Sequence, residues 1–176
     1  MSATPASETP PPSTAALAPV RSSIVVDAPL AEAFRVFTDD IGSWWPTEHH
    51  ILEGELKEMI FERRVGGHVY DRAVDGNECH WARVLVYDPP NRVAFSWDIS
   101  LQWQLETDPA KTSEVEVVFV AEDPDRTRVE LEHRHIERHG DGWEQMHAAV
   151  GSPDGWDAGL RSFARRVATE GTGGRT

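Results

Sequence analysis

Two histidines in the last third of the chain have a spacing that would allow them to act together on a β-strand. His133 and His135 lie in segment 128–135, where Val129 and Leu131 share their parity and charged residues take the other positions. Because strand side chains alternate between faces, we expect both imidazoles on the apolar face. Two such histidines could bind a metal ion or exchange protons near neutral pH. The sequence brings no third ligand close, so we favour hydrogen-bonded histidines lining a pocket, with no metal and no cofactor.

A second histidine pair follows a tryptophan pair on a predicted loop. His49 and His50 come shortly after Trp44-Trp45-Pro46, where they could gate the mouth of a cavity, although exposed loop histidines are ordinary. Arg83, Glu106 or Asp98 could supply the polar group that orients a ligand in a mostly apolar pocket. None of these residues completes a catalytic set, so the sequence assigns no catalytic residue.

The chain contains seven tryptophans, each with a large apolar ring and one N–H that needs an acceptor when buried. Core packing is the ordinary role of such rings, and a pocket wall is the functional alternative. Trp97 and Trp156 are the best wall candidates, whereas the face of Trp81 stays open because both parities of its strand are apolar. The predicted ligand contacts are Trp44, Trp45, Phe95, Trp97, His133, His135, Trp156, Leu160 and Phe163.

Alternating or β-branched segments bounded by turn residues predict the strands, and apolar residues at helical spacing predict the helices. Strands are expected at about residues 24–26, 56–61, 68–72, 79–87, 92–97, 114–121 and 128–135, with two short helices within 29–46 and a last helix over 156–167. Short intervals between strands favour antiparallel pairing. We therefore expect an α+β fold, with a curved antiparallel sheet of about six to seven strands against a long C-terminal helix.

Composition divides the chain into three parts. Residues 1–21 are rich in Pro, Ser, Thr and Ala, which predicts a disordered tail. Residues 22–168 hold the predicted domain, and residues 169–176 are expected to form a flexible C-terminal tail.

Charge and cysteine content exclude several classes of partner. Lys and Arg total 17 against 30 Asp and Glu, and the net charge of −13 disfavours nucleic acids and anionic membrane surfaces. The single cysteine, Cys79, cannot form an intramolecular disulfide, and no apolar run is long enough to span a membrane. We expect a cytoplasmic protein. Phosphate-binding glycine motifs, a GxSxG elbow and a HExxH helix are all absent from the sequence.

Several short segments, none specific alone, occur in an order that is specific. They are Ile24-Val25-Val26-Asp27-Ala28-Pro29, Ile41-Gly42-Ser43-Trp44-Trp45-Pro46, Val65-Gly66-Gly67, Trp81-Ala82-Arg83-Val84, Asp88-Pro89-Pro90, Phe95-Ser96-Trp97, Leu131-Glu132-His133 and Gly155-Trp156. Together they resemble the SRPBCC or START-like superfamily, in the branch related to the activator of the heat-shock-protein-90 ATPase. The resemblance spans about residues 22–168.

The resemblance implies a helix-grip fold, in which the sheet wraps the C-terminal helix and leaves a cavity between them. It also implies three functions, and fold alone does not choose among them. The first hypothesis is non-enzymatic binding of a small, largely apolar molecule. The second is a polyketide cyclase or dehydratase that uses pocket histidine and carboxyl groups, and the third is a protein-interaction module that stimulates a chaperone ATPase.

Overall fold

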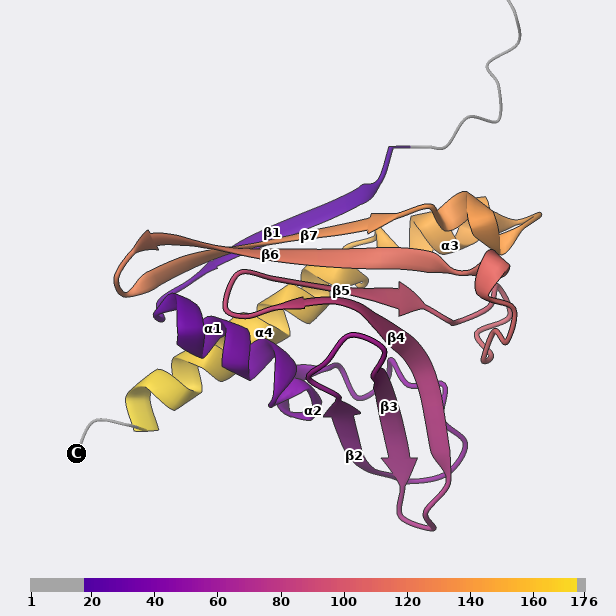
Figure 1. Cartoon of the computed structure of the whole chain (residues 1–176), viewed down its shortest axis with the longest axis horizontal. Helices are drawn as coiled ribbons and strands as arrows, with labels where there is room; N and C mark the ends of the chain where they lie inside the picture. Colours follow the sequence, from indigo (N-terminus) through magenta and orange to yellow (C-terminus); the bar gives the residue numbers. More distant parts are fainter. Residues whose placement is uncertain (1–17, 174–176) are drawn as a thin grey trace, which may run out of the picture.

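The structure is a computed structural model that describes residues 18–173, and it forms a curled sheet with helices packed across it (Figure 1). The strands are β1 (Val20–Val26), β2 (Leu56–Phe61), β3 (His68–Ala73), β4 (Glu78–Asp88), β5 (Arg92–Trp97), β6 (Ser113–Asp123) and β7 (Arg126–Arg134). The helices are α1 (Leu30–Thr38), α2 (Ile41–Trp44), α3 (Trp143–Val150) and α4 (Trp156–Gly173), with short 3-10 helices η1 (Pro109–Lys111) and η2 (Ile136–His139).

The described strands form one antiparallel sheet in the order β1-β7-β6-β5-β4-β3-β2. Consecutive strands from β2 to β7 are neighbours, and β1 joins the open edge beside β7. Short connections make this meander the simplest arrangement. The predicted α+β fold, with two short helices after the first strand and a long C-terminal helix, is confirmed.

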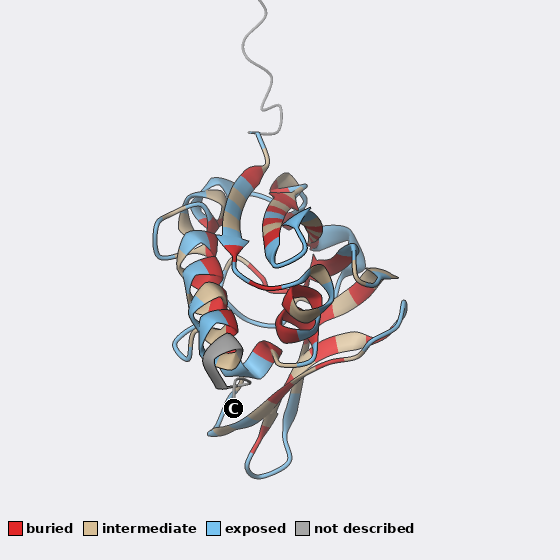
Figure 2. Ribbon diagram, turned by 90° about the vertical axis from the view of Figure 1, so that its left-hand side faces the viewer, coloured by how far each residue is buried: buried red, intermediate tan, exposed pale blue. Residues whose placement is uncertain are grey.

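Helix α4 closes the concave side of the sheet through one apolar face. Trp156, Leu160, Phe163 and Val167 recur at helical spacing, and all four are buried. Figure 2 shows this buried stripe on the side of α4 that faces the interior, with exposed residues on the other side. Phe163 packs edge-to-face on Phe37, with 5.5 Å between ring centroids, which joins α4 to α1.

Element ends differ from the sequence prediction at three places. β1 begins at Val20 and α4 continues to Gly173, so both elements are longer than predicted. The remainder of the predicted tails, residues 1–17 and 174–176, lies outside the described residues. β7 ends at Arg134, and His135 takes a left-handed conformation with φ 61° before η2.

The open question about Trp81 is answered by two irregularities in β4. The pairing with β3 shifts beside Trp81, and the pairing with β5 shifts between Val84 and Val86. A bulge places two neighbouring residues opposite one partner and breaks the strict alternation of faces. Trp81 and Ala82 are consequently both buried, and the Trp81 ring points into the core.

Candidate functional site

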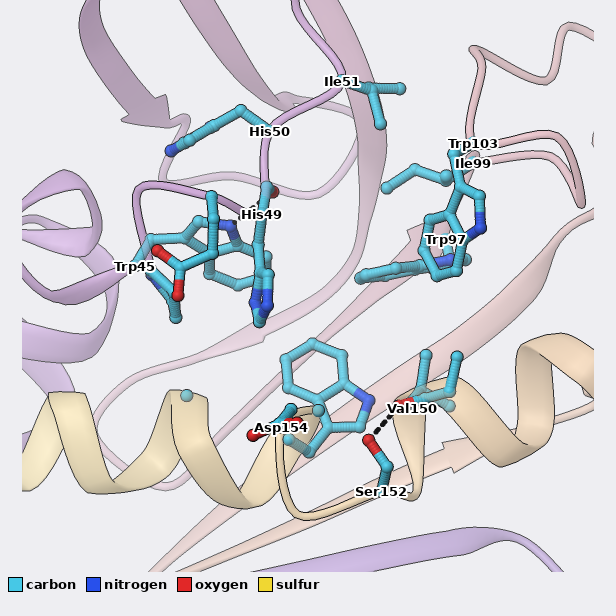
Figure 3. Close-up of a pocket in the computed structure, with 16 residues that line it drawn as sticks. Trp45, His49, His50, Ile51, Trp97, Ile99, Trp103, Val150, Ser152 and Asp154 are labelled. Carbon is cyan, nitrogen blue, oxygen red and sulfur yellow. Dashed lines mark hydrogen bonds between the residues drawn. The ribbon is translucent and has the colours of Figure 1, made fainter.

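A cavity of about 430 Å³ lies at the N-terminal end of α4, bordered by the end of β5 and by loops (Figure 3). This volume is within the range of small-molecule sites. Its lining is mostly apolar and consists of Trp45, Pro46, Glu48, His49, His50, Ile51, Trp97, Ile99, Trp103, Ala149, Val150, Ser152, Asp154, Gly155, Trp156 and Gly159.

Four of the lining residues are tryptophans, and three of them form a continuous wall. The Trp156 ring lies edge-to-face against Trp45 at 5.8 Å and against Trp97 at 5.5 Å between centroids. Trp103 lies on the loop after β5, and its side chain is exposed. Flat aromatic surfaces in these orientations suit a flat aromatic ligand, because rings attract one another by edge-to-face and offset stacking.

Local sequence fixes the position of each wall residue. Pro46 follows α2 and prevents the helix from continuing, so Trp45 turns toward the cavity and its Nε1–H donates to the His49 carbonyl at 3.0 Å. Gly155 permits the tight turn before α4, since a Cβ there would lie 2.2 Å from the Val150 carbonyl oxygen. Trp156 therefore begins α4 directly beside the end of α3.

The far wall is anchored by a polar cluster under the loop that carries Ile99 and Trp103. Arg83 donates two hydrogen bonds to the buried carboxylate of Asp98, at 3.1 and 3.2 Å, and a third to Thr112 Oγ1 at 3.1 Å. A bidentate arginine fixes both distance and orientation. Arg83 and Asp98, which the sequence suggested as ligand-orienting groups, do not line the cavity and instead hold its frame.

Polar groups gather at the mouth of the cavity. The side chain of His49 is exposed and points into the opening in Figure 3, facing the side on which Asp154 lies. The His50 Nδ1 lies 2.8 Å from the buried carboxylate of Asp71, which orients its ring. Both histidines border the cavity mouth, which is the alternative that the sequence left open beside an ordinary solvated loop.

Behind the tryptophan wall runs a buried chain of hydrogen bonds. The Trp156 Nε1–H donates to Nδ1 of His133 at 3.1 Å. Because indole only donates, His133 accepts at Nδ1 and carries its proton on Nε2. The His133 Nε2–H donates a hydrogen bond to Ser113 Oγ at 2.7 Å. The Ser113 hydroxyl then donates to His139 Nε2 at 2.7 Å.

Burial keeps both histidines of this chain neutral. Loss of solvent, with the nearby His139 and His147 adding to it, lowers the pKa of His133 to about 3. Burial also lowers the pKa of His139, opposed by Glu106 and Asp98. His133 is therefore a fixed acceptor for Trp156, and its imidazole lies behind the wall without lining the cavity.

Among residues 18–173, no group of three or more potential ligands is arranged to hold a metal ion. No helix in the same range is long and apolar enough to cross a membrane. Cys79 is half-buried, and burial followed by the charge of Asp71 raises the pKa of its thiol to about 11, which makes it a poor nucleophile.

Comparison with known proteins identifies the family to which the chain belongs. Residues 27–168 match the family model described as activator of Hsp90 ATPase homolog 1-like protein. The chain belongs to this family. The resemblance inferred from the sequence is thereby confirmed, and the Hsp90 ATPase activator-like proteins share the helix-grip fold described above.

Solved structures similar to this chain include a synthase and a resistance protein. An anthrahydroquino-gamma-pyrone synthase, Txn09, solved in complex with a compound named SUM, is 40% identical, with 85% of this chain and 97% of that chain covered and a TM-score of 0.60. CalC, a self-sacrificing resistance protein from Micromonospora echinospora, is 27% identical, with 87% and 96% covered and a TM-score of 0.65. CalU16 from the same organism is 25% identical, with 86% and 77% covered and a TM-score of 0.52. No curated protein matches the chain.

Within this Hsp90 ATPase activator-like fold, the residues predicted to contact a ligand separate into three groups. Trp45, Trp97 and Trp156 line the cavity. Trp44, Phe95, Leu160 and Phe163 are buried in the core and do not border it. His133 is buried behind the wall, and His135 is exposed beyond the end of β7.

The expectation that His133 and His135 share a face is therefore wrong. Strand pairing ends at Arg134, so the alternation of faces no longer applies to His135. Sequence reasoning also missed Ile51, Ile99, Val150 and Trp103, which lie in or beside connecting segments. A tryptophan in a polar loop, as at Trp103, was the one available signal.

Proposed function

We propose that this protein binds a flat, polycyclic aromatic molecule in the tryptophan-lined cavity and closes a ring on it. The observation that carries the proposal is the wall of Trp45, Trp97 and Trp156, completed by Trp103, around a cavity of about 430 Å³. Such a wall offers large rigid apolar faces and selects ligands by shape. The small apolar ligand predicted from the sequence becomes, in this proposal, an aromatic one.

The ring-closing part rests on similarity and on the cavity mouth. The 40% identity to an anthrahydroquino-gamma-pyrone synthase extends over nearly all of that protein. A γ-pyrone forms when a phenolic oxygen adds to a neighbouring carbonyl carbon and water leaves, which needs a group that takes and returns protons. His49 is exposed at the mouth and is the candidate for that role.

Two other predictions accompany this proposal. Cytoplasmic location remains the expectation from the sequence. A chaperone partner is suggested by the family description, but the tryptophan-lined cavity favours a small molecule as the main ligand. Purely non-enzymatic binding is the outcome if the ligand binds and no ring closes.

Binding is tested with anthraquinone-2-sulfonate, a water-soluble three-ring probe, by quenching of tryptophan fluorescence and by calorimetry. We expect micromolar affinity, weakened roughly tenfold by Trp103→Ala because a wall ring is lost. Trp143→Ala is the matched control, since Trp143 lies on α3 outside the cavity lining. Equal affinities in all three proteins, or no binding, would refute the proposed ligand class.

Ring closure is tested with an anthraquinone that carries a hydroxyl group beside a 1,3-diketone side chain. The expected product has lost one water and contains a γ-pyrone ring. Its formation is measured by liquid chromatography and mass spectrometry. His49→Gln is expected to slow product formation roughly a hundredfold and to leave probe affinity within about twofold. Product at the uncatalysed rate with the wild-type protein would leave only the binding function.

A further inference from the structure

Trp97 differs from three other buried tryptophans, Trp44, Trp45 and Trp156, in how its N–H is used. The indole N–H groups of Trp44, Trp45 and Trp156 donate to the Val36 carbonyl, the His49 carbonyl and His133 Nδ1, at 3.2, 3.0 and 3.1 Å. The Trp97 Nε1 is equally buried and has no hydrogen-bond partner within the part of the chain that the structure describes. A buried donor without an acceptor destabilises the folded protein, so its presence needs a reason.

The ring neighbours of Trp97 cannot accept this hydrogen. Trp81 and Trp156, at 5.8 and 5.5 Å between ring centroids, are donors only. The third neighbour is His133, at 5.2 Å, and both of its nitrogens are engaged with Trp156 and Ser113. The buried chain behind the wall thus satisfies Trp156 and leaves Trp97 as the wall indole with an unused donor.

We propose that the Trp97 Nε1–H donates a hydrogen bond to a carbonyl oxygen of the ligand, which makes the preferred ligand a polycyclic aromatic ketone or quinone. The inference rests on the proposed function, because it assumes an aromatic molecule in this cavity. It adds the specificity element that a wall of apolar rings lacks, since ring faces do not distinguish a quinone from a hydrocarbon.

Access to the donor involves a shift of side chains at the far wall. The Nε1 of Trp97 is shielded from water in this structure, and Trp103 borders the same cavity. Trp103 is 48% exposed and sits at φ 58°, an uncommon backbone conformation for a bulky residue. No hydrogen bond or ring contact is found for the Trp103 ring among residues 18–173. Its ring therefore borders the cavity without a side-chain contact among the described residues that would fix its position.

The test compares two probes that differ in their carbonyl groups, anthraquinone-2-sulfonate and anthracene-2-sulfonate. Dissociation constants are measured for the wild-type protein, Trp97→Phe and the matched control Trp45→Phe, whose lost N–H donates to the protein backbone. The preference for the quinone is expected to fall about fivefold in Trp97→Phe and to stay within twofold in Trp45→Phe. The ratio of the two dissociation constants is compared because the loss of ring area in a variant weakens the binding of both probes alike.

A spectroscopic measurement on the wild-type protein keeps the inference testable if Trp97→Phe folds poorly. The Trp97 indole N–H resonance of ¹⁵N-labelled protein is expected to move downfield with the quinone and to stay in place with the hydrocarbon. If both probes bind, with an unchanged ratio in Trp97→Phe or an unmoved resonance, the carbonyl inference is overturned and the proposed function stands. If neither probe binds, the proposed function fails and the inference fails with it.

Discussion

Replacing His133 by glutamine should remove a large part of the acid sensitivity of this protein. His133 is fully buried, and its pKa is lowered from 6.5 to about 3 by loss of solvent and by the neighbouring His139 and His147. Between these two pH values the unfolded chain holds a proton at this site and the folded chain does not. Stability contributed by the neutral imidazole is thus present above about pH 6.5 and is lost as the pH falls.

The size of this pH effect follows from the one proton that the unfolded chain binds at His133 and the folded chain does not. A difference of one bound proton changes the free energy of unfolding by about 1.4 kcal/mol per pH unit, so lowering the pH from 6.0 to 4.5 costs about 2 kcal/mol at this site. Glutamine can accept from Trp156 Nε1 and donate to Ser113 Oγ, as His133 does, and it does not titrate. His133→Gln should therefore be destabilised by about 1–2 kcal/mol at pH 7.5 through poorer packing and should converge on the wild type in acid.

The assay is urea unfolding followed by tryptophan fluorescence at pH intervals from 4.5 to 7.5. The matched control is His135→Gln, the same substitution at an exposed position outside the buried hydrogen-bond chain. Carboxylates titrate in the same range, so the quantity of interest is the difference between wild type and His133→Gln. Parallel curves for these two proteins would refute the neutral, buried state of His133.

Three further predictions concern groups around the cavity. Ser113→Ala deprives two buried histidines of a hydrogen-bond partner and should lower the free energy of unfolding in urea by about 3 kcal/mol. The control Ser152→Ala should lower it by less than about 1 kcal/mol, because the Ser152 hydroxyl donates to a half-buried carbonyl. Arg83→Met leaves the buried Asp98 carboxylate without its ion pair and should destabilise the protein by about 2 kcal/mol; unchanged stability above pH 7 would contradict the anchoring role. Cys79, whose thiol pKa is raised to about 11, should react with a disulfide reagent at pH 8 at least tenfold more slowly than in urea, and equal rates would show that the thiol is accessible.

The fold could be predicted from the sequence because its signals are local and repeated. Strand alternation, turn residues and the apolar stripe of the last helix each report burial on one face, and the order of short motifs resembles one superfamily. The ends of strands and helices could not be predicted in the same way. His135 continues the alternation of β7 in sequence, yet the last pair in the ladder is Glu114 with Arg134, and nothing in the pattern marks where pairing stops.

Two of the three predicted contacts that line the cavity lie there because an element ends or begins, and other predicted contacts lie in the core for a related reason. Trp97 ends a strand and Trp156 begins a helix, and cavities form where elements end and cannot pack fully. Leu160 and Phe163 belong to the same apolar stripe as Trp156, so periodicity cannot separate the turn that borders a cavity from the turns that fill the core. Trp81 could not be assigned because a bulge suspends the alternation on which such an assignment depends.

The histidines of this protein fall into two environments, and that division decides where proton chemistry can occur. His133 and His139 are buried and held neutral, and among the described residues the hydrogen bond that joins them to the cavity wall comes from the Trp156 N–H, which neither gains nor loses a proton near neutral pH. They can orient the wall but cannot protonate a ligand. His49 lies in a loop at the open mouth, on the other side of the wall. Among the described residues that line the cavity, the side chains able to take up or release a proton are those of Glu48, His49, His50 and Asp154, and none of them comes from strand β7.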